Sequence, residues 1–290
     1  GNIPYGAYTR VVREDTRRKD LLFAGTETGL YLSWDGGKSW ERFNLNLPVT
    51  PIQDLMIKHD DLIVATSGRA FWILDDMGLI RQYKPAKDQA VLYTPEPAMH
   101  SNHYSELSSD TEDFEEISIE QGVNPANGVV IYYHLPEALD STDIELVITD
   151  KNGNLVRRLS SKADKDFVSY AGGPRPDPTL SKKKGLNRFV WNMRYPTMKG
   201  APYAYIESSF AGHKVSPGDY TLTLKVGNQE LKTTCTVVDN PLYGLTAADY
   251  DNYHQFMSTV EQEVNVMHQM VSDMLKLQNQ LSAITAGMDK

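Results

Sequence analysis

The sequence predicts a mainly β protein that ends in one long α-helix. Near the N-terminus, short strand-like segments recur after about 40 residues, a spacing typical of β-propeller blades with four short strands each. A second run of short strands, separated by turn residues, favours a β-sandwich. The last part of the chain carries a helical apolar pattern without Pro or Gly. We therefore expect a partial β-propeller of about two four-stranded blades, then a β-sandwich, then a long C-terminal α-helix.

The predicted propeller region covers residues 1–84. Strands are expected where aromatic and aliphatic residues cluster between turn residues. Thr26 corresponds to Thr66, and Asp35 to Asp76 after a slip of one residue, so the strand pattern repeats. Two unrelated β-meanders are the alternative interpretation. The expected strands are residues 8–13, 21–26, 30–34, 39–43, 52–58, 62–66, 71–74 and 79–83.

Residues 85–122 are predicted to form a linker, because several prolines interrupt regular structure and an acidic, Ser-rich stretch follows. The predicted sandwich covers residues 123–240. A tight hairpin turn is expected at Asn152 and Gly153, since Asn-Gly tolerates positive φ. The strands of this region are expected at residues 129–135, 144–149, 155–159, 187–193, 220–226 and 230–238.

Residues 241–290 are predicted to form a helix that starts at Thr246 as N-cap and stops at Gly287. About 41 helical residues make a rod on the order of 60 Å long, more than a domain of this size needs. The rod is expected to pack along a helix of a longer chain or along a second copy of this chain. The alternative is that it lies on the two β regions. The predicted seam contains Tyr253, Met257, Val260, Val264, Met267, Val271, Met274 and Leu281, widened by Phe256, Met270, Leu277 and Ile284.

The composition excludes several classes of protein. The chain has 290 residues, with 29 Lys and Arg against 38 Asp and Glu, and a formal net charge of −9. This acidic balance argues against nucleic-acid binding, which needs clustered positive charge. No apolar stretch has the length of a membrane-spanning helix. The single cysteine, Cys235, excludes an internal disulfide, and the leading Gly1 leads us to expect a piece of a longer protein.

The most specific motif lies at residues 33–40, SWDGGKSW, which resembles the Asp-box pattern S-x-D-x-G-x-T-W with Ser39 in place of Thr. Asp35 is expected to accept backbone hydrogen bonds inside a hairpin corner, and Trp40 to pack over that corner. Such a corner is a folding device on the rim of a blade and not a catalytic site. The predicted Asp-box residues are Ser33, Asp35, Gly37, Ser39 and Trp40.

Further segments resemble a family of secreted bacterial BNR-repeat proteins. Residues 68–76, GRAFWILDD, are similar to the family's GRGxWxLDD segment, with Ala70 in place of the second Gly. Residues 124–133, NPANGVVIYY, resemble the NPPxGAxIxY segment that begins the family's next domain. The segments 150–157, 189–194 and 216–220 resemble the FlgD-type immunoglobulin-like module. The resemblance covers about residues 8–245.

The resemblance implies the C-terminal part of a secreted or periplasmic bacterial protein with a sortilin- and sialidase-like propeller. The sandwich would be immunoglobulin-like, and the remaining blades would precede residue 1. The implied role is non-catalytic: propeller closure, spacing, and protein or glycan binding. The alternative is part of a glycosyl-hydrolase-like enzyme, a sialidase-like glycoside hydrolase whose catalytic residues lie in other blades. Arg10, Arg13, Arg69 and Arg81 are present here, but two blades cannot surround a sugar.

We predict no catalytic residue, no cofactor and no metal site in this chain. Trp34, Tyr203 and Tyr205 are candidate aromatic contacts for a glycan or a protein, whereas core packing is favoured for Trp72. Self-association is expected, either through the helical seam or through the open edge of the last blade, because an unpaired edge strand pairs readily with another chain.

Overall fold

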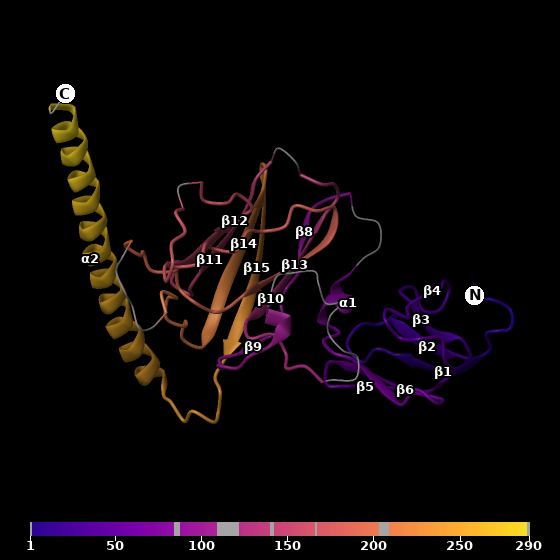
Figure 1. Ribbon diagram of the computed structural model, residues 1–290. Helices are drawn as coiled ribbons and strands as arrows, with labels where there is room; N and C mark the ends of the chain where they lie inside the picture. The colour runs from indigo at the N-terminus through magenta and orange to yellow at the C-terminus, as the bar shows by residue number, and fades with distance from the viewer. Residues whose placement is uncertain are drawn as a thin grey trace. The chain divides into compact units, whose positions relative to one another are not determined.

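The computed structural model describes residues 2–83, 88–108, 122–139, 142–165, 167–202 and 209–288. The chain divides into two compact units, Gly1–Ala86 and Lys87–Lys290. Figure 1 shows that both units are built mostly from strands and that the second ends in a long helix. The predictions of a mainly β chain and of a long C-terminal helix are therefore confirmed.

The N-terminal unit contains two small antiparallel sheets. Their strand orders are β1-β2-β3-β4 and β5-β6-β7, so each sheet is a meander of sequential neighbours. The strands are β1 (Thr9–Glu14), β2 (Leu22–Thr26), β3 (Gly29–Ser33), β4 (Glu41–Arg42), β5 (Ile52–Lys58), β6 (Asp61–Thr66) and β7 (Phe71–Leu74). Both sheets bury one side in a single core that includes Phe23, Leu32, Leu55 and Leu62.

The two sheets of this unit approach each other closely at Gly25 in β2. A Cβ atom at this position would lie 2.5 Å from the side chain of Ile52 and 2.8 Å from that of Val11. Such distances are shorter than carbon atoms tolerate. Glycine is therefore required where the first sheet meets the second.

The predicted strand at residues 79–83 is wrong. These residues form a short helix, α1 (Gly78–Gln82), so the second sheet has three strands in the described part of the chain where four were expected. Asp76 turns the backbone with a φ of 59°, and its carboxylate accepts a 2.9 Å hydrogen bond from the N–H of Gly78. Over so few residues, an apolar run fits a helix as well as a strand.

The C-terminal unit contains two sheets with the strand orders β13-β10-β8 and β12-β11-β14-β15-β9. They share one core, in which Trp191, Tyr133 and Phe189 are among the largest buried side chains. Along β10 and β11, buried and partly exposed residues alternate, as in a sheet with one side in a core. The strands are β8 (Val91–Leu92), β9 (Ala98–Met99), β10 (Val129–Leu135), β11 (Ile144–Thr149), β12 (Leu155–Ser160), β13 (Gly185–Trp191), β14 (Gly218–Val226) and β15 (Gln229–Val238).

The linker prediction for residues 85–122 is wrong for part of that range. β8 pairs with β10, with Leu92 opposite Tyr133, and β9 pairs in parallel with β15, with Ala98 opposite Val237. Two-residue strands between prolines are too short to show a periodic pattern. The acidic stretch at residues 109–121 lies outside the described residues.

The C-terminal helix, α2 (Ala247–Met288), has 42 residues. A capping box starts it: the Thr246 hydroxyl accepts a 3.3 Å hydrogen bond from the N–H of Asp249, whose carboxylate accepts one of 2.8 Å from the N–H of Thr246. The helix continues one residue beyond the predicted stop at Gly287. Within the described ranges, no helix combines the length and the apolar character needed to cross a bilayer.

Candidate interaction surfaces

The corner at residues 33–40 is held by hydrogen bonds to one carboxylate. Asp35 accepts a 2.9 Å bond from the N–H of Ser39 and bonds of 2.5 Å and 2.8 Å from the hydroxyls of Ser39 and Ser33. The hydroxyl of Ser39, above all, lowers the pKa of Asp35 to about 2. Gly37 has a φ of 86°, and its carbonyl accepts a 3.0 Å bond from the indole N–H of Trp40. These polar atoms therefore form hydrogen bonds within the corner and stabilise its turn.

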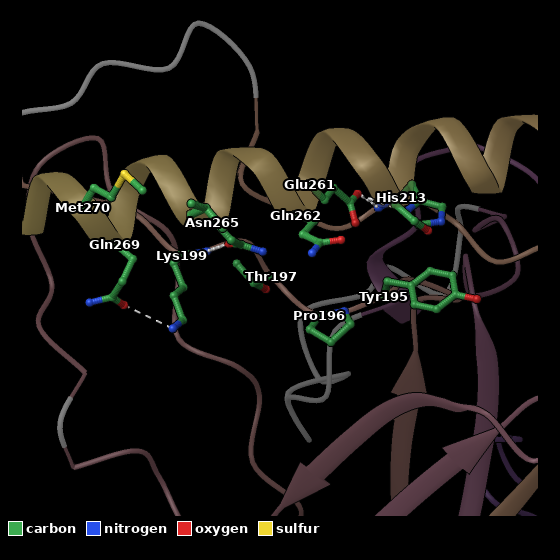
Figure 2. A pocket seen from close by; sticks show the side chains of 12 residues that line it. Tyr195, Pro196, Thr197, Lys199, His213, Glu261, Gln262, Asn265, Gln269 and Met270 are labelled. Carbon is green, nitrogen blue, oxygen red and sulfur yellow. Dashed lines mark hydrogen bonds and ion pairs between the residues drawn. The ribbon is translucent and has the colours of Figure 1, made fainter.

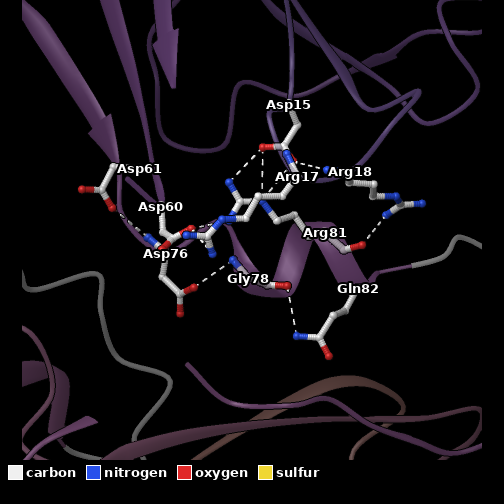
Figure 3. Close-up of polar contacts among 9 residues, drawn as sticks. All are labelled: Asp15, Arg17, Arg18, Asp60, Asp61, Asp76, Gly78, Arg81 and Gln82. Atoms are coloured by element: carbon white, nitrogen blue, oxygen red, sulfur yellow. Dashed lines mark hydrogen bonds and ion pairs between the residues drawn. The ribbon is translucent and has the colours of Figure 1, made fainter. Parts of the chain in front are cut away.

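A buried ion pair lies where α1 meets the sheets of the N-terminal unit (Figure 3). The side chain of Asp15 is completely buried and pairs with Arg81 at 2.9 Å. Asp15 also accepts hydrogen bonds of 3.0 Å and 2.6 Å from the backbone N–H groups of Arg17 and Arg18. Burial alone would raise the pKa of Asp15, but the hydrogen bonds from Arg81 and from these backbone groups lower it below its usual value. Arg81 also contacts Asp60, in the turn between β5 and β6.

A second arginine completes this cluster. Arg18 donates hydrogen bonds of 3.1, 2.8 and 2.9 Å to the carbonyls of Ile80, Arg81 and Tyr83, at the C-terminal end of α1. Its guanidinium also lies 4.9 Å from the centre of the Trp34 ring, which in turn packs against the ring of Tyr83. Trp34, predicted as a candidate glycan or protein contact, is therefore half-buried inside the unit.

Two of the other arginines considered for a sialidase-like site are engaged in ion pairs. Arg10 pairs with Glu27 at 2.7 Å, and Arg13 pairs with Asp54 at 2.7 Å. Each cation is thus neutralised by a neighbouring carboxylate on its own sheet or on the adjacent one. Tyr203 and Tyr205 lie outside the described residues. Within the described part of the chain, no three His, Cys, Asp or Glu side chains are placed to hold a metal ion.

The second sheet of the N-terminal unit exposes an apolar outer face. Met56, Phe71 and Ile73 are 55%, 75% and 58% exposed. The register places Met56 opposite Ile63, Ile63 opposite Ile73, and Ala65 opposite Phe71, so these side chains form a continuous surface across three strands. Trp72 points to the other side and packs against the core, as expected.

α2 is fastened to the C-terminal unit by buried polar groups (Figure 2). The backbone N–H of His213 donates a 2.6 Å hydrogen bond to the carboxylate of Glu261, which also lies 3.0 Å from the imidazole Nδ1 without a well-aligned bond. The Nε2 atom of His213 lies 2.8 Å from Nδ1 of His254. The ring of Tyr195 stacks on both imidazoles, at 4.4 Å and 5.0 Å between ring centres. Burial lowers the pKa of His213 despite the nearby carboxylate.

A second group of polar contacts attaches α2 to its unit two turns further along the helix. The buried imidazole of His268 contacts the carbonyl of Lys199 at 2.6 Å, and Asn265 accepts a 2.6 Å bond from the N–H of Lys199. A cavity of about 590 Å³ lies between α2 and the segment from Tyr195 to Lys199. Several polar groups that line the cavity already bond to one another. The cavity is therefore better explained as a gap in the packing of α2 on its unit than as a catalytic site.

The opposite face of α2 is apolar and exposed. The predicted seam residues do not share one face: Met257, Val264 and Val271 are half-buried, whereas the other five are exposed. Apart from Val266, the large exposed apolar residues of α2 repeat with alternating steps of three and four, and only Glu263 interrupts them. They are Tyr253, Phe256, Val260, Met267, Met270, Met274, Leu277, Leu281 and Ile284.

The signal that the seam prediction missed is the spacing of the polar residues. His254, Glu261 and His268 recur every seven residues, and all three face the unit to which α2 is attached. A stripe of ionisable residues at heptad spacing normally marks a solvated face, so the sequence alone does not reveal that these three residues attach the helix.

No protein family and no curated protein matches the chain. Among solved structures, the extracellular domain of a proposed one-component system from B. thetaiotaomicron matches at 12% identity and a TM-score of 0.21, over 82% of this chain and 26% of that chain. The extracellular domain of a proposed hybrid two-component system from the same organism matches at 12% identity and a TM-score of 0.21, over 83% and 27%. This chain therefore spans about a quarter of the length of both, and at such TM-scores the likeness carries no argument about fold or function.

Proposed function

We propose that this chain is a non-catalytic structural and interaction region of a larger secreted BNR-repeat protein. In this proposal the N-terminal unit is the end of an Asp-box β-propeller, and the C-terminal unit is a FlgD-type immunoglobulin-like sandwich with a helix that recruits a partner. Its partners would be the remaining blades and other proteins or glycans at the bacterial surface or in the periplasm.

The observation that carries the proposal is the apolar outer face of the second sheet. Propeller blades are small sheets that stack face to face around an axis, and each interior blade buries both of its faces. Here one face of the β5-β6-β7 sheet packs on the first sheet, while Met56, Phe71 and Ile73 on the other face remain exposed. Three large apolar side chains adjoining across strands form a surface of the kind that another sheet covers.

The charged groups of the N-terminal unit support a structural role over a catalytic one. Asp15 and Arg81 are buried and bonded to each other, and Asp35 is bonded to its own turn. A catalytic acid or base must be able to reach substrate and exchange a proton with it. Groups held in this way stabilise the fold instead.

The test measures the hydrogen-exchange rates of the β7 backbone amides in two proteins. One is the 290-residue chain, and the other is the full polypeptide encoded by the gene from which it comes. We expect exchange of these amides to be at least about tenfold slower in the full polypeptide, because a further blade would cover them. Equal exchange in both proteins, or a locus that encodes no preceding blades, would contradict the proposal.

A matched pair of substitutions sharpens this test. Phe71→Glu should lower the melting temperature of the full polypeptide and leave that of the 290-residue chain nearly unchanged. Val49→Glu, at another exposed apolar position, should change neither. Hydrolysis of fluorogenic sialosides by the full polypeptide would instead favour the glycoside hydrolase alternative.

A further inference from the structure

A second cavity adjoins the first on the side of α2 that faces its own unit. It has a volume of about 900 Å³ and lies between α2 and three parts of the chain, residues 158–164, 167–179 and 197–202. Leu275, which lines it, continues the seven-residue spacing of His254, Glu261 and His268, so it lies on the face of α2 that is attached to the unit. A cavity of this volume accommodates a drug-sized molecule. We call it the loop cavity.

Hydrogen bonds fix the loop walls of this cavity. The buried Arg157 of β12 donates bonds of 2.5 Å to the carboxylate of Asp177 and of 2.6 Å to the carbonyl of Tyr195. The N–H of Leu180 donates a 3.0 Å bond to the carbonyl of Ser160. These contacts tie the proline-rich segment 174–178 to the sheet, so the fold itself forms the cavity.

Tyr170 forms part of the wall, and two glycines allow its ring to lie close to the backbone. A Cβ atom at Gly173 would lie 2.7 Å from Cζ of the ring, and a Cβ atom at Gly200 would overlap the hydroxyl oxygen. Any larger residue at these positions would therefore displace the ring. The ring of Tyr170 is thus a fixed surface of the loop cavity.

Apolar groups make up most of the wall. They come from the side chains of Leu159, Phe167, Tyr170 and Leu275 and from four prolines. Several of the polar side chains already bond to neighbours, since Asp177 accepts a bond from Arg157 and Lys199 donates one to Gln269. A sugar carries a hydroxyl group on most of its carbons and needs a more polar wall than this. The loop cavity suits a ligand with a compact apolar body instead.

Cations outnumber carboxylates among the residues that line the loop cavity, although the whole chain has a formal net charge of −9. The cations are Arg158, Lys162, Arg175, Lys199 and Lys276, and the carboxylates are Asp164 and Asp177. Of the two carboxylates, Asp177 is already paired with Arg157 at 2.5 Å. A surplus of cations along a cavity raises the local concentration of anions.

Three of these cations have no carboxylate partner among the residues that the structure describes. They are Lys162, Arg175 and Lys199, and we call them the unpaired cations. The ammonium group of Lys199 donates a 3.2 Å hydrogen bond to the neutral amide of Gln269, which leaves its charge uncompensated (Figure 2). The other two of the five cations pair with carboxylates beside the cavity. The charge of the unpaired cations is therefore available to an acidic group.

We propose that the loop cavity binds a small amphipathic anion, a molecule with an apolar ring system and one acidic group such as a carboxylate or a sulfonate. The apolar body lies against Tyr170, Leu275 and the prolines, and the acidic group is attracted by the unpaired cations. The site belongs to the C-terminal unit alone, so it does not depend on the role proposed for the N-terminal unit.

Probe fluorescence tests the class of ligand with the full 290-residue chain. The probe 8-anilinonaphthalene-1-sulfonate is an amphipathic anion whose fluorescence rises in apolar surroundings, and N-phenyl-1-naphthylamine is the same molecule without the sulfonate. We expect saturable binding of the sulfonate with a dissociation constant on the order of 10 to 500 μM, and at least about fivefold weaker binding of the neutral probe. No saturable binding, or equal affinities for the two probes, would overturn the proposal.

A matched pair of substitutions separates the loop cavity from the exposed face of α2, which a fluorescent probe can also bind. Leu275→Glu places a carboxylate inside the cavity and should weaken binding of the sulfonate probe at least about tenfold. Leu277→Glu places the same charge two residues away, at a side chain that is 56% exposed, and should leave binding unchanged. Equal effects of the two variants, or a loss in Leu277→Glu alone, would refute the assignment to the cavity.

A second pair of substitutions tests the unpaired cations. Arg175 and Lys151 are both exposed, so their replacement by Gln should not disturb folding. Arg175→Gln should weaken binding of the sulfonate probe about threefold or more. Lys151→Gln, in the turn between β11 and β12, removes the same charge outside the cavity and should have no effect. Equal affinities of both variants would contradict the role of the cavity's charge.

Competition tests the apolar body. The aromatic carboxylate 2-naphthoate should displace the sulfonate probe, whereas glucuronate, a sugar acid of the same charge, should not displace it at the same concentration. Displacement by glucuronate equal to that by 2-naphthoate would show that the acidic group alone is recognised and would overturn the proposed class of ligand.

Discussion

Each unit contains a buried polar cluster that holds a helix in place, and these two clusters differ in the groups they use. In the N-terminal unit, Asp15 and Arg81 remain charged throughout the range of pH in which proteins usually work. In the C-terminal unit, Glu261 is bonded to His213, whose imidazole is the kind of group that titrates in that range. The first cluster holds a short helix and two sheets together permanently. The second attaches α2, and we expect this attachment to depend on pH.

The largest effect is expected when the permanent cluster is broken. Asp15→Ala leaves the guanidinium of Arg81 buried with only its contact to Asp60. Removal of one partner of a buried pair costs about 3–5 kcal/mol, so we expect the unfolding free energy of the N-terminal unit to fall by that amount. Urea denaturation followed by tryptophan fluorescence measures it. Asp54→Ala, at an exposed pair, should cost less than about 1 kcal/mol, and an equal loss from both variants would contradict this contrast.

An intermediate effect is expected at the attachment of α2. Glu261→Ala removes the acceptor of the buried His213 N–H, and an unpaired buried donor costs about 1–3 kcal/mol. The loss should be local, so hydrogen exchange of residues 254–268 should accelerate while that of β10 and β11 stays unchanged. Glu263→Ala, on the exposed face of the same turn, provides the control and should leave exchange unaffected. Acceleration across the whole unit would show that the contact is not local.

The smallest effect is expected from pH. Burial lowers the folded-state pKa of His213, so the unfolded chain binds a proton more readily than the folded one. The corresponding stability is complete above the unfolded-state pKa of about 6.5 and is lost as pH falls through the lower folded-state pKa. The protection factors of the α2 amides near His213, which compare each exchange rate with the intrinsic rate at the same pH, should therefore fall between pH 7.5 and 5.5, whereas those of the N-terminal unit should not change. A His213→Phe variant without this dependence would support the assignment; a variant that kept it would refute it.

The sequence predicts those elements well whose local residue pattern is compatible with only one kind of secondary structure. β5, β7, β10 and β11 begin and end at the predicted residues, because apolar residues cluster between clear turns. The hydrogen bonds expected at Asp35 follow from the chemistry of a short side chain within a glycine turn. In both cases the information lies within a few neighbouring residues.

The parts that the sequence did not predict depend on distant residues. α1 is a helix because Arg81 and the end of its backbone bond to Asp15 and Arg18, more than sixty positions earlier in the chain. β8 and β9 exist only because complete sheets offer them an edge. The two stripes of α2 share Tyr253, Val260, Met267, Met274 and Leu281, so the choice between them depended on contacts with His213 and Lys199 in another part of the fold.

The parallel pairing of β9 with β15 has a consequence for the order in which the chain folds during synthesis. Thr94 and Thr233, whose hydroxyls meet at 2.7 Å beside this pairing, are 139 positions apart in the sequence. The ribosome must therefore release almost the whole C-terminal unit before its larger sheet can close, and contacts of such long range form slowly. The meanders of the N-terminal unit close over short distances and can form first. Until β14 emerges, the core strand β11 lacks its neighbour on one side, so the nascent chain is most exposed to aggregation after the N-terminal unit has formed and before the C-terminal unit is complete.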